Sequence, residues 1–330
     1  MSIIGLDLGY GFVKVTDGKS GFTFPSVVGE YQDNPVFKVL PYAADELNDL
    51  KIGIDGNIFN VGKAALKHSK YVYRDLSLTR SEGNDLRILF LVALGLFCTA
   101  PINKFKIVTG LPVDRYNLKG MLKELMQGEH NISLFRNGKQ EDLKIIIEQV
   151  EVVIQPLGTY WSEALQSNGQ TVQALERKVG IVDIGFKTSD LVLIDDGEYV
   201  GEMSKTITTA VSTSYSNIGD ELFKHYGIEL ESHMLDECVI KRKINILGNP
   251  TDISDILNNA FIKLSKKILV ELNSNWKTKE LDSVLISGGG GQALYPYLAP
   301  HIKQAKLVDE AVSANSRGFY LWGRRLWNEG

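Results

Sequence analysis

The stretch Ile3-Ile4-Gly5-Leu6-Asp7-Leu8-Gly9-Tyr10-Gly11-Phe12-Val13-Lys14-Val15 organises the chain, because its pattern occurs twice. An apolar run ends in an acid, glycine follows, and a second apolar run leaves the loop. The repeat is Val179-Gly180-Ile181-Val182-Asp183-Ile184-Gly185-Phe186-Lys187-Thr188-Ser189-Asp190-Leu191-Val192-Leu193-Ile194. Both outgoing runs end in the same kind of turn, at Asp17-Gly18 and Asp196-Gly197. The pattern predicts two similar strand–loop–strand hairpins.

The two loops have the chemistry of a clamp for nucleotide phosphates. Glycines at positions 9 and 11 let backbone amides approach phosphate oxygens that a Cβ would keep away. Asp7 ends its strand, where a carboxylate can hold a water of hydrated Mg²⁺. Lys14 lies across the hairpin and can neutralise phosphate charge, and Asp183 with Gly185 offers a matching loop. One Asp-x-Gly is weak evidence, but its duplication favours a site for phosphoryl transfer to water.

Composition places the chain among ordinary soluble globular proteins long enough for two domains. Its 330 residues carry a net charge of −4, which excludes the basic bias of nonspecific DNA binding. Cys98 and Cys238 have no CxxC partner, so we expect free thiols in a reducing compartment. The histidines are scattered without metal-ligand spacing, and no transition-metal site is expected.

No segment has the sequence of a membrane span. The longest apolar run, Ile88 to Cys98, is shorter than the ~20 residues that cross a bilayer and predicts a buried helix. The chain enters its first strand directly, without the basic region and apolar core of a signal peptide. We therefore expect a cytoplasmic protein that does not span a membrane.

Strands and helices alternate in both halves of the chain. Further strands are expected at 22–28, 50–54, 58–61, 105–113, 150–155, 198–204, 281–287 and 305–308, with turns at Asp55-Gly56 and Asn137-Gly138. Helices are expected at 82–99, 116–126, 159–167, 211–226, 233–243, 253–272, from Gln292 onward, and at 314–327. This order predicts a duplicated α/β fold with the active site between its lobes.

Two further features bear on nucleotide chemistry. Gly288–Gly291 follow a predicted strand and would let an adenosine or α-phosphate rest against the backbone. The chain has no GxxxxGK[ST] and no GxGxxG start of a βαβ unit, which excludes Walker-type ATPases and argues against a dehydrogenase. Gln155 ends a buried strand before Pro156, and its amide can orient an attacking water. An ordinary polar strand end explains Gln155 equally well.

Together these motifs resemble those of the superfamily of actin, heat-shock chaperones and sugar kinases. Asp7–Lys14 resembles its first phosphate motif, Asp183-Ile184-Gly185 the second, Ile286–Gly291 the adenosine motif, and Gln155 the connecting position. The match spans essentially the whole chain.

Two stretches narrow the resemblance to the plasmid-segregation actins of ParM type. They are Val108-Thr109-Gly110-Leu111-Pro112-Val113 and Asn315-Ser316-Arg317-Gly318-Phe319-Tyr320. The Gly-Tyr-Gly of the first loop is also similar to a small archaeal actin homologue. Tyr10 stands where many family members have Ser or Thr, and ParM has an acid in place of Gln155, where actin has glutamine.

The resemblance implies roles for particular residues. Asp7 and Asp183 would organise Mg²⁺ through water, and with Gln155 on the hydrolytic water they form the implied catalytic set. Glu237 and Lys241 would lie near the ribose or base. The implied nucleotide-binding residues are Gly9, Tyr10, Gly11, Lys14, Gly185, Phe186, Lys187, Thr188, Glu237, Lys241, Gly288, Gly289, Gly290 and Gly291.

The resemblance also implies a fold: duplicated ribonuclease-H-like, actin-type domains, each a five-stranded mixed sheet with helices, with nucleotide in the cleft between lobes. We expect domain I at 1–156, with a small subdomain at about 30–70, and domain II at 157–309. Residues 310–330 are expected to form a C-terminal helix that returns to domain I.

Among superfamily activities, a filament-forming ATPase is favoured. A sugar kinase needs a carboxylate base, and Asp114, the one acid in the loop 110–115, is better explained as a helix cap. A chaperone needs a peptide-binding domain for which no length remains. We therefore expect Mg²⁺-dependent hydrolysis of ATP, with GTP as the alternative nucleotide, and self-association into filaments. An adaptor protein would connect the filament to plasmid DNA, without direct nucleic-acid or membrane contact. The alternative is a non-filamentous member, such as a small-molecule kinase or an ATP-dependent activation factor.

Overall fold

The computed structural model describes residues 1–32, 46–70, 72–73, 84–136, 139–172, 176–230 and 232–327. The chain divides into two compact units. Unit 1 comprises Met1–Leu175 and Ser313–Gly330, and unit 2 comprises Glu176–Val312. The turn predicted at Asn137-Gly138 and residues 33–45 of the predicted small subdomain lie outside the described residues.

Unit 1 is built on one mixed sheet with the strand order β3-β2-β1-β8-β10-β9-β5-β6-β4-β7. Its strands are β1 (Ser2–Leu8), β2 (Phe12–Thr16), β3 (Gly21–Pro25), β4 (Val28–Glu30), β5 (Lys51–Ile54), β6 (Asn57–Val61), β7 (Val72–Tyr73), β8 (Ile102–Leu111), β9 (Gly128–Arg136) and β10 (Lys139–Ile154). Its α-helices are α1 (Lys63–His68), α2 (Asn84–Gly95), α3 (Lys119–Met126), α4 (Leu157–Ala164) and α9 (Ala314–Trp327). Short 3₁₀ turns cover Glu46–Asn48 and Val113–Leu118.

The first five strands of this order are the expected mixed core. β1 pairs antiparallel with β2 and parallel with β8, and β10 pairs parallel with β8. The sheet then continues beyond five strands, because β9 pairs with both β10 and β5. The strand expected at 150–155 is the second half of a longer strand, β10, which begins at Lys139. A bulge between Ile147 and Gln149 absorbs the irregularity, so β10 continues through it without a break.

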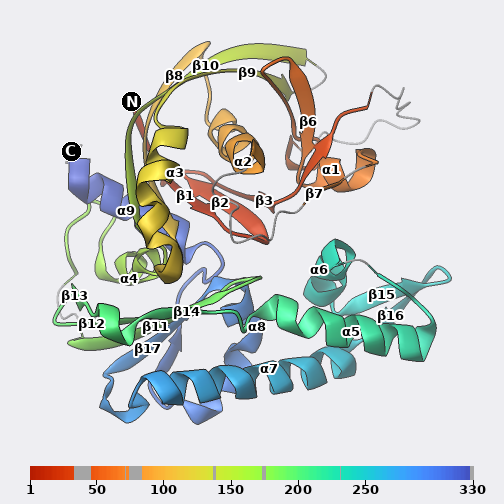
Figure 1. Ribbon diagram of the computed structural model, residues 1–330, viewed down its shortest axis with the longest axis vertical. Helices are drawn as coiled ribbons and strands as arrows, with labels where there is room; N and C mark the ends of the chain where they lie inside the picture. The colour runs from red at the N-terminus through yellow and green to blue at the C-terminus, as the bar shows by residue number, and fades with distance from the viewer. Residues whose placement is uncertain are drawn as a thin grey trace. The chain divides into compact units, whose positions relative to one another are not determined.

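The sheet of unit 1 curves around α2 (Figure 1). Every residue of α2 from Ile88 to Gly95 is buried, which explains its apolar sequence. The helix ends at Gly95, four residues before the predicted end. Arg136 donates hydrogen bonds to the carbonyls of Gly95 and Cys98 and so satisfies the last turn.

Unit 2 repeats the core in the order β13-β12-β11-β17-β18, with β14 also paired to β12. Its strands are β11 (Lys178–Ile184), β12 (Ser189–Asp195), β13 (Glu198–Tyr199), β14 (Lys205–Ile207), β15 (Lys243–Ile246), β16 (Asn249–Asp252), β17 (Ser283–Ser287) and β18 (Ala305–Leu307). Its α-helices are α5 (Val211–Tyr226), α6 (Ser232–Lys241), α7 (Ser254–Asn275) and α8 (Gly288–Leu298), and 3₁₀ turns cover Gly201–Met203, Thr278–Glu280 and Ala299–His301. The parallel strands β11, β17 and β18 match β1, β8 and β10 of unit 1.

Two sequence predictions for unit 2 are wrong in detail. Of the strand expected at 198–204, only β13 forms. A 3₁₀ turn follows it, in which the Ser204 hydroxyl donates to the Val200 carbonyl, and β14 begins after the expected range. The helix expected from Gln292 begins at Gly288 instead. Gly288 has φ +81°, a value that glycine adopts without strain and that turns the chain directly from β17 into α8.

Helices α4 and α9 of unit 1 pack closely against each other. A Cβ on Gly318 would lie 1.7 Å from the Gly158 carbonyl oxygen, so the two backbones are in contact. Buried Asn315 accepts hydrogen bonds from the Thr159 amide at 3.0 Å and the Thr159 hydroxyl at 2.8 Å. Both helices belong to unit 1, whose first segment ends at Leu175 and whose second begins at Ser313.

No helix in the described ranges is long and apolar enough to cross a membrane. Both cysteines are free thiols: Cys98 is buried and Cys238 is half-buried. Burial raises the pKa of Cys98 to about 11, so its thiolate form is scarce at neutral pH.

Candidate functional site

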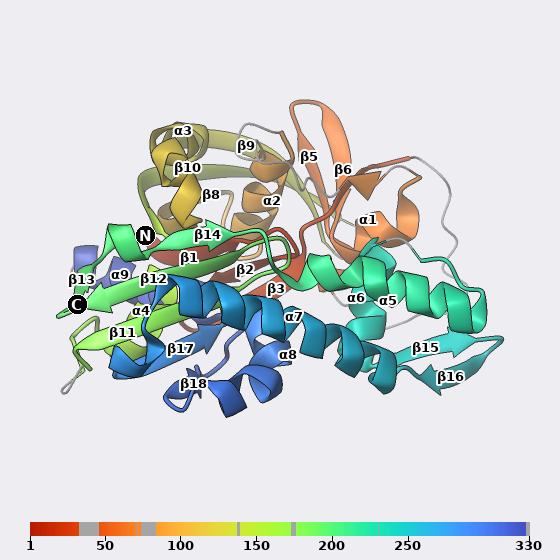
Figure 2. The same ribbon diagram turned by 60° about the horizontal axis from the view of Figure 1, so that its bottom comes forward.

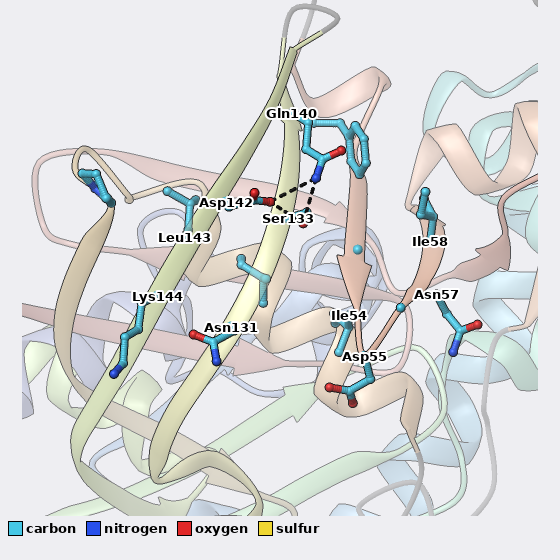
Figure 3. Close-up of a pocket in the computed structure, with 15 residues that line it drawn as sticks. Ile54, Asp55, Asn57, Ile58, Asn131, Ser133, Gln140, Asp142, Leu143 and Lys144 are labelled. Carbon is cyan, nitrogen blue, oxygen red and sulfur yellow. Dashed lines mark hydrogen bonds between the residues drawn. The ribbon is translucent and has the colours of Figure 1, made fainter.

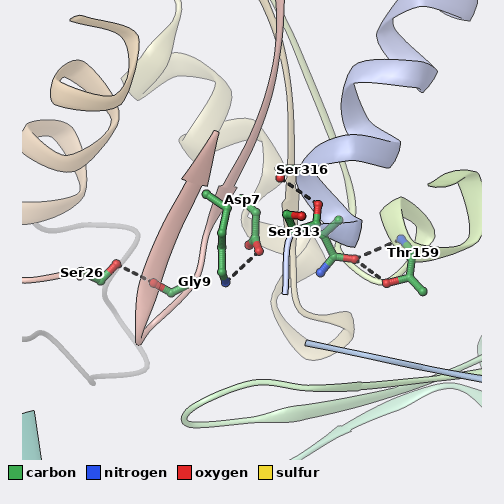
Figure 4. A network of polar contacts seen from close by, with 8 residues as sticks. Asp7, Gly9, Ser26, Thr159, Ser313 and Ser316 are labelled. Atoms are coloured by element: carbon green, nitrogen blue, oxygen red, sulfur yellow. Dashed lines mark hydrogen bonds and ion pairs between the residues drawn. The ribbon is translucent and has the colours of Figure 1, made fainter. Parts of the chain in front are cut away.

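The glycine loop between β1 and β2 is held in shape by a buried ion pair and a serine (Figure 4). Asp7 is 3% exposed, and its Oδ2 lies 3.0 Å from Lys14 Nζ. The two residues are direct cross-strand partners in the β1–β2 pair. Ser26 donates its hydroxyl to the Gly9 carbonyl at 2.6 Å, and its amide donates to the Gly11 carbonyl at 2.9 Å. The loop carrying Tyr10 is thus anchored at both of its glycines.

Gly9 is required by the close approach of the Phe12 backbone and also lies against the ion pair. A Cβ at this position would lie 2.8 Å from Lys14 Nζ and 2.8 Å from the Phe12 carbonyl oxygen. The sequence prediction assigned Gly9 and Lys14 only to phosphate. The structure adds that Lys14 already compensates a buried carboxylate, which is costly to leave without a cation.

Gln155 lies at the junction of β10 and α4. Its backbone amide donates to the Leu111 carbonyl at 2.8 Å, and its backbone carbonyl accepts from the Gly158 amide at 3.0 Å. Among the described residues, Gln155 makes both of these hydrogen bonds through its backbone. Gly110 packs directly behind it, since a Cβ there would lie 2.7 Å from Gln155 Cα. The backbone at Gln155 is therefore fixed, while its half-buried side chain is available to another group.

The glycine loop between β11 and β12 occupies the equivalent place in unit 2. Asp183 is 4% exposed near the end of β11, before the tight turn in which the Gly185 amide donates to the Thr188 carbonyl at 3.0 Å. The Phe186 carbonyl accepts from the Ser212 amide at 2.8 Å, which ties the loop to the start of α5. The Lys187 side chain of this turn is half-buried.

The aromatic ring of Phe186 fixes the same loop from its other side. The ring packs edge-on against Tyr215 of α5, with centroids 5.2 Å apart. Tyr215 in turn donates its hydroxyl to buried Asp236 of α6 at 2.8 Å. The loop, α5 and α6 therefore form one connected structure within unit 2.

The run Gly288–Gly291 is explained only in part by packing. A Cβ on Gly288 would lie 2.5 Å from Asp183 Oδ1, and one on Gly290 would lie 2.6 Å from side-chain carbons of Ile184 and Val211. Gly291 lies against Ile286. Gly289 differs, because it is exposed and its Cβ would meet no atom within 4 Å. Packing accounts for three of the glycines and leaves the fourth open to a ligand.

Glu237 and Lys241 form an exposed ion pair on α6. Their side chains are 71% and 65% exposed and face one another one helical turn apart. The Glu237 hydrogen bond raises the pKa of Lys241. A Glu four residues before a Lys is an ordinary stabilising pair on a helix surface, so the pair alone does not mark a ligand site. The structure brings these two residues together and places Asp236, their buried neighbour, in the contact with Tyr215.

The sequence analysis overlooked Asp190. It is 2% exposed and is the direct cross-strand partner of Asp183, so the two carboxylates share one face of the sheet. Thr206 of β14 donates a hydrogen bond to Asp190. Aligning the two repeats would have found it, since Asp190 follows Asp183 at the spacing that separates Lys14 from Asp7. The repeats are therefore not identical in charge: unit 1 pairs its acid with lysine and unit 2 pairs its acid with another acid.

The donor set fits hydrated Mg²⁺ better than a metal held wholly by protein. Each unit supplies a buried carboxylate next to a glycine-containing loop. Within the described ranges, no group of three or more His, Cys, Asp or Glu side chains could hold a metal ion. Magnesium usually keeps several waters and binds through one or two carboxylates plus substrate phosphates.

A groove of about 500 Å³ lies elsewhere on unit 1, between the β5–β6 hairpin and strands β9 and β10 (Figure 3). The carboxylates of Asp55 and Asp142 line it. Ser133 donates to Asp142 at 2.6 Å, and Gln140 donates to both. The Ser133 hydrogen bond lowers the pKa of Asp142, which is therefore ionised at neutral pH. Two carboxylates make this groove unsuitable for a polyphosphate.

The chain matches two protein families over most of its length. Residues 5–158 match the N-terminal domain of actin-like proteins. Residues 181–299 match the C-terminal domain of the MreB-like archaeal actin homologue. No curated protein matches the sequence.

Solved structures of similar fold cover the whole chain. A ParM from a 15-stranded filament of Clostridium botulinum is 24% identical, with a TM-score of 0.83 over 98% of this chain and 100% of that one. A non-polymerisable quadruple mutant of pCBH ParM is 24% identical, with a TM-score of 0.80 over 98% and 99%. An archaeal actin homologue in complex with ADP is 18% identical, with a TM-score of 0.81 over 98% and 100%.

Proposed function

The chain belongs to the actin-like proteins, and we propose on that basis that it is a nucleotide-dependent ATPase that assembles into filaments. The observation that carries the proposal is the duplicated loop. Each unit presents a buried acid on its central strand, a glycine-containing reversal, and a charged cross-strand partner. An archaeal homologue of the same fold was solved with ADP, which supports nucleotide as the ligand.

The proposed chemistry assigns each loop residue a task. Asp7 and Asp183 would hold waters of Mg²⁺, which would supply neutralisation of the phosphate charge. Backbone amides of the loops containing Gly9 and Gly185 receive phosphate oxygens. Lys14, the cross-strand partner of Asp7, would neutralise phosphate charge at the same loop. Gln155 orients the attacking water through its amide, which cannot itself take the proton.

The remaining proposed contacts concern the nucleoside and the loop side chains. The backbones of Gly288–Gly291 face the adenosine, with Gly289 as the open position. Tyr10, Gly11, Phe186, Lys187 and Thr188 complete the phosphate contacts, and Glu237 with Lys241 lies toward the ribose or base. ATP is the proposed nucleotide and GTP the alternative. We place the activity in the cytoplasm.

We propose that filament assembly moves plasmid DNA, which an adaptor protein connects to the filament. One similar chain forms a 15-stranded filament and another is a non-polymerisable mutant, which supports self-association as the working state. The chain's net charge of −4 favours an adaptor over direct contact with DNA.

Gly289 offers a test of the adenosine contact that does not disturb the fold. We expect Gly289→Ala to weaken nucleotide binding about tenfold, since about 1.4 kcal/mol of lost contact has that effect. The unfolding temperature should stay the same or rise, because alanine is favoured over glycine in a helix. Titration calorimetry and thermal melts measure both quantities. Gly219→Ala, at an equally open position of α5, is the matched control and should bind as wild type. Unchanged affinity in Gly289→Ala would remove Gly289 from the site.

The kinase alternative is tested by the fate of the phosphoryl group. With Mg²⁺ and ATP alone, we expect inorganic phosphate to accumulate after assembly begins. Adding sugars or other hydroxyl compounds should leave the rate of ADP production unchanged. A small molecule that accelerates ADP production and carries the phosphate, with nothing sedimenting, would establish the non-filamentous alternative.

A further inference from the structure

The β15–β16 hairpin presents an apolar side chain where the fold gains nothing from it. Leu247 at its tip is 98% exposed. The hairpin forms its own two-stranded sheet, separate from the main sheet of unit 2, beyond the ends of α5 and α7 (Figure 2). A large exposed apolar side chain at a projecting tip is typical of an interaction site.

The backbone conformation at Leu247 is unfavourable for a leucine. Leu247 has φ +49° and Gly248 has φ +86°, the left-handed pair of a tight hairpin turn. The chain makes the same turn at Asp55-Gly56, with φ +53° and +81°, and at Asp196-Gly197, with φ +49° and +80°. Both of those turns use Asp, which tolerates the left-handed region. Leucine does not, so Leu247 costs stability that its exposed side chain cannot recover within the monomer.

A complementary surface is present on unit 1 in the groove of Figure 3. The groove includes the apolar side chains of Ile58 and Phe135, and the amides of Asn57 and Asn131. Its volume of about 500 Å³ is ample for one leucine with its neighbouring hairpin residues.

The charges of the two surfaces also match. In the groove, Asp55 is paired with Arg87, and Lys144 is paired with Glu129. The hydrogen bonds to Asp142 come from neutral groups and leave a negative charge. Beside the hairpin, Lys241 is paired with Glu237. Asp252 opposes the charges of both Arg242 and Lys243, so these three side chains leave one net positive charge.

We propose that the hairpin tip led by Leu247 inserts into this groove on a second copy of the chain. The proposal rests on the proposed function, since it names the contact through which the filament grows. The tip and the groove are different surfaces, so the contact is heterologous and repeats along an open assembly.

The substitution Leu247→Asn separates assembly from folding. Asn-Gly is the preferred sequence for this turn, so the variant should fold at least as stably as wild type by thermal melt. Loss of the inserted side chain should raise the critical concentration for ATP-dependent sedimentation about tenfold or more. Val270→Asn, at a residue of α7 that is 66% exposed, is the matched control and should assemble as wild type. Assembly of Leu247→Asn at the wild-type concentration would overturn the proposal.

Cross-linking tests the groove directly. Purified Asn249→Cys, which keeps Leu247 and places the thiol beside the tip, should yield a covalent dimer when mixed with Asn131→Cys, Mg²⁺-ATP and a short bismaleimide. A chain carrying both substitutions should yield a ladder of oligomers. Val270→Cys mixed with Asn131→Cys accounts for the natural thiols Cys98 and Cys238. If these cysteine variants sediment but no dimer forms, the pairing is wrong, although the filament function stands. If wild type does not sediment at all, the proposed function fails instead.

Discussion

Replacing Asp183 with alanine should reduce the rate of phosphate release from ATP at least about hundredfold, because a loss of about 3 kcal/mol in transition-state stabilisation has that effect. The carboxylate is 4% exposed near the end of β11 and directly faces the Gly288 turn. In the proposed mechanism it holds Mg²⁺ through water, a task that alanine cannot perform. Release is measured at saturating Mg²⁺-ATP, beside a thermal melt that checks folding.

Two further variants make the Asp183 result specific. Asp183→Asn keeps the size of the side chain and removes its charge, so it should remain folded and still lose most of the activity. Asp195→Ala removes a carboxylate from the opposite end of the same hairpin, at the end of β12 remote from the loop, and should hydrolyse ATP normally. Wild-type turnover in Asp183→Ala would contradict the assignment of this residue.

Replacing Gly318 with alanine should lower the free energy of unfolding of unit 1 by about 3 kcal/mol. The added Cβ would lie 1.7 Å from the Gly158 carbonyl oxygen, and this neighbour is backbone that no side-chain rotation can move. The helices α4 and α9 would have to separate, which would strain the hydrogen bonds between Thr159 and Asn315.

Denaturant unfolding of Gly318→Ala measures this cost. Gly120→Ala in α3 is the matched control, because its Cβ would meet nothing within 4 Å. That substitution should change the free energy of unfolding by no more than about 1 kcal/mol, in the stabilising direction. Equal stability of Gly318→Ala and wild type would mean that α4 and α9 are not in backbone contact.

The sequence predicted the repeated hairpins and most helices well because local signals decide them. Alternating apolar runs separated by Asp-Gly gave β5–β6 its correct turn, and helical periodicity gave α5 and α9 their observed bounds. The predicted actin-like fold was confirmed. It was predictable because the two similar halves of its strand order are visible in the sequence as repeated hairpins.

Where the sequence analysis failed, distant contacts decide the structure. The continuity of β10 depends on pairing with β8 and β9 on its two sides, which no local pattern encodes. The start of α8 at Gly288 depends on how that residue packs against Asp183. A run of glycines normally predicts a loop, and only the tertiary contacts convert it into a first helical turn.

The sequence indicated the acids of the candidate site but not the residues that surround them. Asp7 and Asp183 stand out by duplication, whereas the ion pair of Asp7 with Lys14 and the burial of Asp190 follow from strand register. Glu237 and Lys241 came from resemblance alone, and in unit 2 they form an exposed pair on α6.

Sedimentation of the purified chain with Mg²⁺-ATP tests the central claim most directly. The protein should pellet and scatter light with ATP or a non-hydrolysable analogue, and phosphate release should lag assembly. Without nucleotide it should remain in the supernatant, and after the ATP is consumed the pelleted fraction should fall. A protein that binds ATP but stays in the supernatant under all of these conditions would contradict the filament account.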